Sequence, residues 1–274
     1  MISACVVSVG SHKFVEIFLE SLSQQTNLVD EILIANVTKD ELYNKEYTIG
    51  NIKVREMGSK YTSPPSTKLA GFPWLSAQHA LALHDIIKET KNELLLLSHH
   101  DVFLYMDAPK LLKDLLEKYN LDIVGCSLPG VNYHCQGIFP NLIFTLVKKS
   151  SLPNDDFLKG KITLNGENFD GKYLLGCDYL EPELMNLYPC PKGALDTAHL
   201  LYLCAVKLGW RWLAIGTDDL HIYNTKYSKS NVEEIKLKIQ KLIYHQTGGA
   251  AFWPQSESTF VKKYEEYKEE IKDE

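Results

Sequence analysis

The chain has 274 residues and a formal net charge of -6 at pH 7. This length allows one large α/β domain or two small ones. The acidic balance gives no electrostatic footprint for nucleic acid or for an anionic membrane surface, so we expect a small molecule or a glycan as partner. The sequence has no signal-peptide pattern at its start and no run of about 18 apolar residues, which predicts a soluble, cytoplasmic protein without a transmembrane segment. Six cysteines without a Cys-x-x-Cys pair indicate neither a zinc site nor a disulfide framework.

Strand and helix patterns alternate through the first half of the chain. Strands are predicted at 3–9, 31–37, 52–57 and 123–127, and helices at 12–25, at 75–90 and from Asp107 onward. This alternation is the signature of an α/β fold with a mostly parallel sheet and helices on its faces. Two polar segments, 38–51 and 58–73, are expected to be a surface excursion and a long loop.

The stretch LLLLSHHDVFLY at 94–105 is the centre of the predicted sheet. Its four leucines indicate a strand buried on both faces, and polar groups at the carboxyl end of such a strand lie where α/β folds keep their ligands. Side chains alternate along a strand, so His99 and Asp101 should share one face while His100 points to the other. The first two could hold a divalent cation. Alternatively, the histidines satisfy buried backbone groups and Asp101 begins a turn.

The second half of the chain is less regular. It contains a predicted strand at 142–147, a helix at 196–208 ended by Gly209, a strand at 211–215 and an amphipathic helix at 232–245. A charged tail has apolar residues at helical spacing, which indicates a further helix packed on the outside. Its apolar residues are Phe260, Tyr264, Tyr267 and Ile271.

Three further places could contribute chemistry. Val9 and Gly10 end the first strand just before a helix, where backbone amides could approach a nucleotide, although no Gly-x-Gly-x-x-Gly or Walker motif is present. Asp196 opens a predicted helix and is either a functional carboxylate or a helix N-cap. Asp219 and His221 would share a face of an extended segment and could form a second half of a metal site.

These motifs, in this order, resemble nucleotide-sugar-dependent glycosyltransferases of the GT-A fold, close to family 2, over about residues 1–224. The first strand, helix and second strand are similar to that family, including Leu-x-Ser-Leu-x-x-Gln-Thr at 19–26. LLLLSHHDVFL is similar to its metal-binding strand, with His-x-Asp-Val where others have Asp-x-Asp. The segment 195–224 resembles its acidic residue at a helix start, the Lys-x-Gly-Trp turn that follows and a later histidine.

The resemblance implies a single GT-A-like domain at 1–274, with a Rossmann-like, mostly parallel sheet. It implies a nucleotide-sugar-binding half at 1–127, an acceptor half at 128–231 and C-terminal helices at 232–274. A sugar would pass from a nucleoside-diphosphate sugar to a glycan or another hydroxyl acceptor. Two alternatives remain open, a sugar nucleotidyltransferase and a non-catalytic nucleotide- or glycan-binding protein. Assembly into a homo-oligomer is also left open.

The resemblance also assigns roles to single residues. Asp101 and His221 would bind Mn²⁺ or Mg²⁺, which stabilises the diphosphate leaving group. Asp196 would be the general base of an inverting transfer. The donor nucleotide would be held by Val9, Gly10, Asn36, His99 and His100, with packing as the alternative role for His100.

Overall fold

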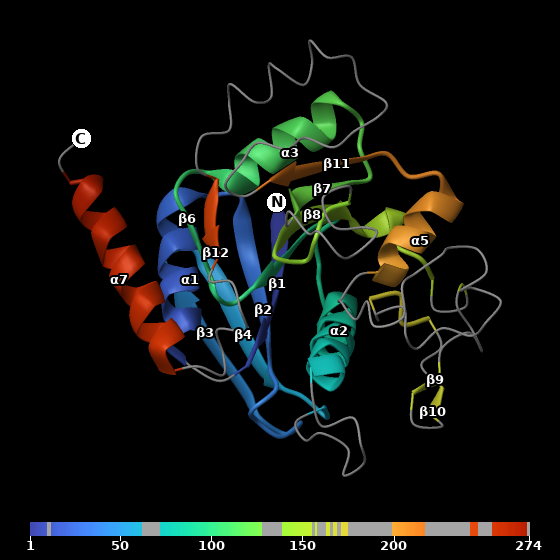
Figure 1. The fold of residues 1–274 in the computed structure, drawn as a ribbon, viewed down its shortest axis with the longest axis horizontal. Helices are drawn as coiled ribbons and strands as arrows, with labels where there is room; N and C mark the ends of the chain where they lie inside the picture. The colour runs from blue at the N-terminus through green and yellow to red at the C-terminus, as the bar shows by residue number, and fades with distance from the viewer. Residues whose placement is uncertain are drawn as a thin grey trace.

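The computed structural model has an eight-stranded sheet at its centre (Figure 1). The described residues are 1–9, 12–61, 72–127, 139–154, 157, 163–164, 167–168, 171–174, 199–216, 242–245 and 254–272. The strands follow the order β11-β7-β8-β5-β1-β2-β4-β3. Their bounds are β1 Ile2–Ser8, β2 Val29–Asn36, β3 Asn44–Ile49, β4 Ile52–Gly58, β5 Leu94–His99, β7 Ile123–Ser127, β8 Phe144–Lys148 and β11 Trp212–Gly216.

Most of the sheet is parallel. Parallel pairing joins β5 to β1, β1 to β2, β2 to β4, and β11 to β7. β8 is antiparallel to both β5 and β7, and β3 is antiparallel to β4. All the other strands therefore run in one direction and bring their carboxyl ends to one edge, where open α/β sheets bind ligands. The predicted α/β fold with a mostly parallel sheet is confirmed.

Helices cover both faces of the sheet because its central strands are apolar on both sides. In β5, Leu95, Leu96 and Leu97 have no exposed surface. Leu96 packs in the core beneath α1 (His12–Gln25) and α3 (Ala108–Lys118). Leu95 and Leu97 face the opposite core, which α2 (Phe72–Lys88) and α5 (His199–Leu208) cover. The alternation expected of the four-leucine run is thus present.

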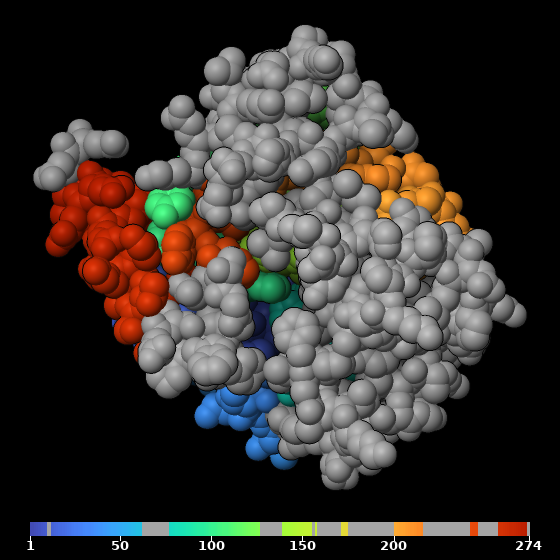
Figure 2. Space-filling view, viewed as in Figure 1, coloured from blue at the N-terminus to red at the C-terminus, as the bar shows by residue number. Residues whose placement is uncertain are grey.

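A small second sheet lies beside the carboxyl end of β5. It consists of β6 (Val102–Leu104) and β12 (Ile243–His245), which pair antiparallel. The outer helix α7 (Pro254–Glu270) packs against α1 through an aromatic cluster, defined here as Phe14, Ile17, Phe103, Phe260, Tyr264 and Tyr267. Figure 2 shows α7, in red, on the flank of the molecule with the orange-red β12 beside it. The predicted packing of the charged tail on the outside is therefore correct for Phe260, Tyr264 and Tyr267, whereas Ile271 is 43% exposed.

Several smaller features complete the described part of the chain. The strands β9 (Thr163–Leu164) and β10 (Glu167–Asn168) pair with each other, and η1 (Lys149–Ser151) is a short 3-10 helix. Three of the cysteines, Cys5, Cys126 and Cys204, are buried and free. Within the described ranges, no helix combines the length and the apolar character that a membrane crossing requires.

Two local predictions are wrong. The predicted helix at 232–245 does not reach its end, since 243–245 form the strand β12; the part at 232–241 lies outside the described residues. The polar segment 38–51 contains β3, an edge strand whose residues are mostly exposed. Both strands depend on a partner elsewhere in the chain, and neither has enough apolar residues for a clear period-two pattern.

A buried carboxylate joins β1, β2 and the turn that enters β5. Glu31 accepts hydrogen bonds from the Ser3 hydroxyl (2.6 Å) and the Lys91 amide (3.1 Å), and it pairs with Lys91 Nζ at 2.9 Å. Burial alone would raise the pKa of Glu31, but these hydrogen bonds outweigh it and hold the pKa below its ordinary value. The ionised form of Glu31 therefore stabilises the fold.

Glu31→Gln should lower the free energy of unfolding by about 1–2 kcal/mol at pH 7, because hydrogen bonds to a charged group contribute more than neutral ones. A depressed pKa contributes stability above the unfolded-state pKa of about 4.3 and loses it as the pH falls through the folded-state value. The difference from wild type should therefore shrink below about pH 4. Urea unfolding of the wild type and the variant, at pH 7 and below about pH 4, measures this difference. Glu46→Gln, on the exposed strand β3, is the control and should change little.

Candidate metal centre

The central strand places two of the predicted site residues on one face. His99 ends β5, opposite Val7 of β1, and its ring lies 4.8 Å from that of His79 on α2. His100 points to the other face, where its ring contacts Phe14 of α1 at 5.5 Å. Asp101 Oδ1 lies 3.8 Å from His99 Nδ1. The face assignments follow the alternation expected for this strand.

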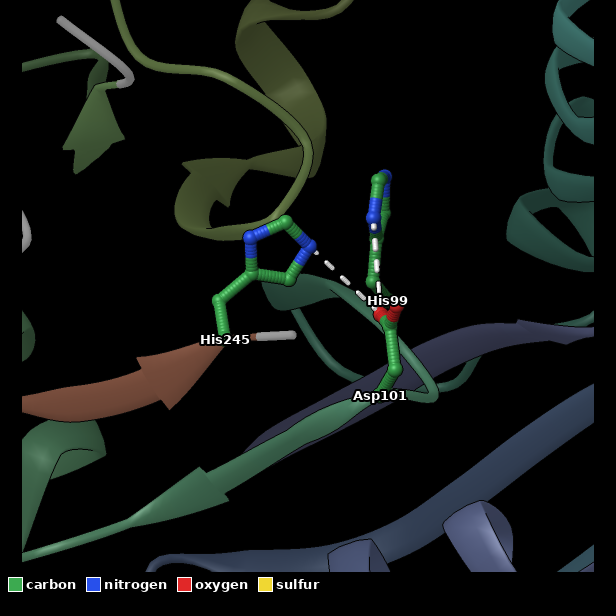
Figure 3. Close-up of side chains that lie close together, drawn as sticks. All are labelled: His99, Asp101 and His245. Carbon is green, nitrogen blue, oxygen red and sulfur yellow. Dashed lines mark ion pairs between the residues drawn. The ribbon is translucent and has the colours of Figure 1, made fainter. Parts of the chain in front are cut away.

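A second histidine reaches the same carboxylate from the far end of the chain. In the β6–β12 pair, His245 stands opposite Val102, the residue after Asp101. His245 Nε2 therefore lies 3.6 Å from Asp101 Oδ1 (Figure 3). The ligand atoms of His99, Asp101 and His245 all lie within 4.8 Å of one another. We call these three residues the His-Asp-His cluster.

The chemistry of the cluster fits a divalent cation. Asp101 is only 6% exposed, and its Oδ1 has no hydrogen-bond partner among the described residues. Burial raises the pKa of Asp101 to about 7 and lowers the pKa of His99 to about 4 and that of His245 to about 3. The imidazoles are therefore neutral at pH 7, which is the form that binds metals. A buried carboxylate without a partner is costly, and a bound cation would compensate it.

His100 belongs to a different environment from the cluster. Burial, and secondarily the neighbouring His99, lower the pKa of His100 to about 3, against the effect of hydrogen bonds with the backbone of Val7 and Val9. It is 6% exposed and packs against α1. This arrangement ties β5 to the carboxyl end of β1, as expected for the packing alternative.

A polar pocket of about 270 Å³ lies at the carboxyl ends of β1, β2 and β4. Within it, Asn36 donates to Glu56 Oε1 at 2.6 Å and accepts from the amide of Thr38 at 3.0 Å. The hydroxyl of Tyr43 donates to Glu56 Oε2 at 3.3 Å. The residues that line the polar pocket are Ser8, His12, Asn36, Thr38, Lys39, Tyr43, Lys45 and Glu56. β1 separates β2 from β5, so Asn36 lies two strands away from the His-Asp-His cluster.

Of the remaining predicted site residues, Val9 lies within the described part of the chain. Gly10, Asp196 and His221 lie outside the described residues. Val9 is partly buried against the core on the α2 side. Sequence reasoning missed His245, because 232–245 was predicted as one helix. The long-range pairing of β12 with β6 shows the position of His245, and no local sequence motif predicts that position.

Comparison with known proteins identifies the architecture. No family model and no curated protein matches the sequence. Among solved structures, an active-site mutant of LgtC matches with a TM-score of 0.51 and 9% identity, covering 95% of this chain and 94% of that one. This chain has the GT-A fold. The GT-A fold expected from the resemblance is confirmed, while membership of family 2 stays a prediction.

Two other solved structures match with lower TM-scores. A mannosyltransferase from Pyrobaculum calidifontis in complex with GDP-Man and Mn²⁺ has a TM-score of 0.42 and 12% identity, over 97% of this chain and 71% of that one. TarS from S. aureus has a TM-score of 0.44 and 13% identity, over 86% of this chain. This chain spans 42% of the length of that TarS chain. The LgtC structure shares its fold with this chain over nearly the whole length of both.

Proposed function

We propose that this protein is a glycosyltransferase that uses a divalent cation to move a sugar from a nucleoside-diphosphate sugar to a hydroxyl acceptor. The observation that carries the proposal is the His-Asp-His cluster at the ligand-binding edge of a GT-A sheet. The cluster combines a buried, unpartnered carboxylate oxygen with two neutral imidazoles. Such a mixed donor set suits a transition-metal ion with open positions for other ligands.

The residues of the cluster would hold the cation at a site that excludes water. Asp101 would hold the cation through Oδ1, with His99 and His245 contributing one imidazole nitrogen each. When bound, the cation supplies positive charge for the diphosphate that leaves during transfer. The burial of Asp101 excludes water and so strengthens electrostatic interactions at this edge of the sheet. His221, predicted as a ligand from the resemblance, would join the same cation.

The polar pocket supports a site for the nucleoside part of the donor. Asn36 ends the second strand, where the family that the sequence resembles often has an acidic residue. Here Glu56 of β4, which is 4% exposed, places its carboxylate beside Asn36. The Asn36 side-chain amide donates a hydrogen bond to this carboxylate at 2.6 Å. A carboxylate accepts hydrogen bonds from hydroxyl groups, such as those of a ribose. We infer that Asn36 and Glu56 together recognise the nucleoside, next to Val9 and Gly10.

The transfer itself is proposed to be inverting, with Asp196 as the general base. A single carboxylate that accepts the proton of the acceptor hydroxyl is sufficient for a direct displacement at the sugar carbon. The acceptor would be a glycan or a small hydroxyl compound bound by the second half of the chain, at 128–231. The site then requires no nucleophilic serine or cysteine.

Nucleoside diphosphates should raise the melting temperature of this protein only when Mn²⁺ or Mg²⁺ is present, since ligands that bind only the folded state stabilise it. UDP, GDP, ADP and CDP are compared, each with and without cation. A sugar nucleotide with the same base as the stabilising nucleotide should then release its nucleoside diphosphate. This release separates an enzyme from a non-catalytic binder. Release of pyrophosphate from a sugar phosphate and a nucleoside triphosphate would instead indicate a nucleotidyltransferase. If no nucleotide changes the melting temperature, the proposed function is wrong.

A further inference from the structure

A third imidazole lies beside the His-Asp-His cluster and has no explanation in the packing. His79 on α2 contacts the ring of His99 at 4.8 Å, edge to face. Both of its ring nitrogens are buried, and neither has a hydrogen-bond partner among the described residues. A neutral imidazole has one donor and one acceptor, and buried polar groups are nearly always paired. His79 therefore needs a partner that the described residues do not supply.

The surroundings of His79 make a purely structural role costly. Its neighbours Ala77, Ala80 and Leu83 pack in the apolar core between α2 and the sheet. An apolar side chain at position 79 would satisfy that environment without desolvating two nitrogen atoms. Among the described residues, its ring contacts that of His99, a member of the cluster.

We propose that His79 is a further imidazole ligand of the cation, beside Asp101 and the two imidazoles of the His-Asp-His cluster. This inference rests on the cation site of the proposed function and adds its metal preference. Mg²⁺ binds oxygen ligands and keeps its water, whereas imidazole suits first-row transition metals. A centre with three imidazoles should therefore select a transition-metal ion over Mg²⁺.

The spacing of the rings brings His79 within reach of the cation site. With metal–nitrogen bonds of about 2.1 Å, two imidazoles on one ion have ring centroids about 4.6 Å apart at a right angle and about 5.3 Å apart at a tetrahedral angle. The His79–His99 centroids are 4.8 Å apart, and the His99–His245 centroids are 5.5 Å apart. His99 thus lies between two imidazoles at ligand-like distances. The nitrogens of His79 lie outside the 4.8 Å cluster, so its side chain must rotate to bind.

The direct test counts the imidazoles on the metal in the wild-type protein. Protein labelled with ¹⁵N-histidine is loaded with Mn²⁺, and pulsed electron paramagnetic resonance measures the nitrogen couplings. Since His221 is also a predicted ligand, the count is compared between the wild type and His79→Phe. The loss of one coordinated imidazole in the variant supports the inference, and an unchanged count overturns it. This measurement needs no donor nucleotide, so it is independent of catalysis.

Variants give a second, quantitative readout. His79→Phe keeps a ring of similar size and should weaken Mn²⁺ binding about 10–100-fold, the effect usual for a lost metal-site group, while changing Mg²⁺ binding little. His84→Phe is the matched control, because His84 is on the same helix, buried, and packed edge to face on Tyr173 at 5.1 Å. Unchanged Mn²⁺ affinity in His79→Phe would refute ligation by His79. If His79→Phe does not fold, His79→Gln takes its place.

The failure of this inference can be told apart from the failure of the proposed function. The loss of one coordinated imidazole in His79→Phe, without any response of the wild type to nucleoside diphosphates, would support ligation by His79 and contradict the glycosyltransferase. An unchanged imidazole count in His79→Phe, together with a metal-dependent response to nucleotides, would overturn the role of His79 and leave the proposed function intact.

Discussion

Asp101→Asn should weaken Mn²⁺ binding and slow the release of nucleoside diphosphate from a sugar nucleotide, by at least about 100-fold each. This is the usual effect of removing one preorganised electrostatic group. Asp101 Oδ1 is the atom that both His99 Nδ1 and His245 Nε2 approach, at 3.8 and 3.6 Å. Asparagine keeps the volume of the side chain but removes its charge. Mn²⁺ titration followed by a release assay measures the two effects in the same preparation.

Stability separates this effect from a folding defect. Without a cation, Asp101 is a buried carboxyl group with an unpartnered oxygen, so Asp101→Asn should leave the free energy of unfolding unchanged or raise it. Asp107→Asn is the matched control, because Asp107 caps α3 by accepting from the Lys110 amide at 3.1 Å and asparagine caps a helix equally well. Wild-type Mn²⁺ affinity in Asp101→Asn would contradict the cation site.

The central part of the fold could be predicted from the sequence because its signals are local. Leu95, Leu96 and Leu97 are fully buried and face both sides of the sheet, which requires a covered sheet interior. The same alternation that places Leu95 and Leu97 on the α2 side also places His99 there. Thus the shared face of His99 and Asp101 follows from the periodicity of one strand.

The order of the strands could not be predicted in the same way. β8 was expected as a strand, but its antiparallel insertion between β5 and β7 depends on which partners its two edges find. Nothing in the local pattern of a short apolar strand determines its neighbours or its direction. The same limit hid β12, whose three residues were predicted as the end of a helix.

The residues of the candidate site likewise differ in how far the local sequence predicts their positions. Asp101 and His99 are two residues apart, and their relation depends on one strand. His245 joins them only because β12 pairs with β6 in a register that places it opposite Val102. His79 joins through the orientation of α2 on the sheet, which depends on tertiary packing. Asp196 and His221 remain predictions.

Because His245 depends on this pairing, its position should be sensitive to α7. A three-residue strand pair is too short to be stable alone. Tyr244 stacks on Phe103 with ring centroids 5.0 Å apart, and Phe260 of α7 contacts both rings, at 5.5 Å from Phe103 and 6.0 Å from Tyr244. The aromatic cluster thus holds β12 against β6.

Phe260→Ala should therefore lower the free energy of unfolding by about 3–5 kcal/mol, the usual cost of emptying a buried phenylalanine site. It should also weaken Mn²⁺ binding by the folded protein about 10-fold, as expected when the support of a ligand is lost. Phe18→Ala is the matched control, since Phe18 is equally buried on α1 but packs in the core beneath the large sheet. It should cost similar stability and leave Mn²⁺ affinity unchanged. Equal Mn²⁺ affinities in the two variants would mean that β12 holds His245 in place without help from α7.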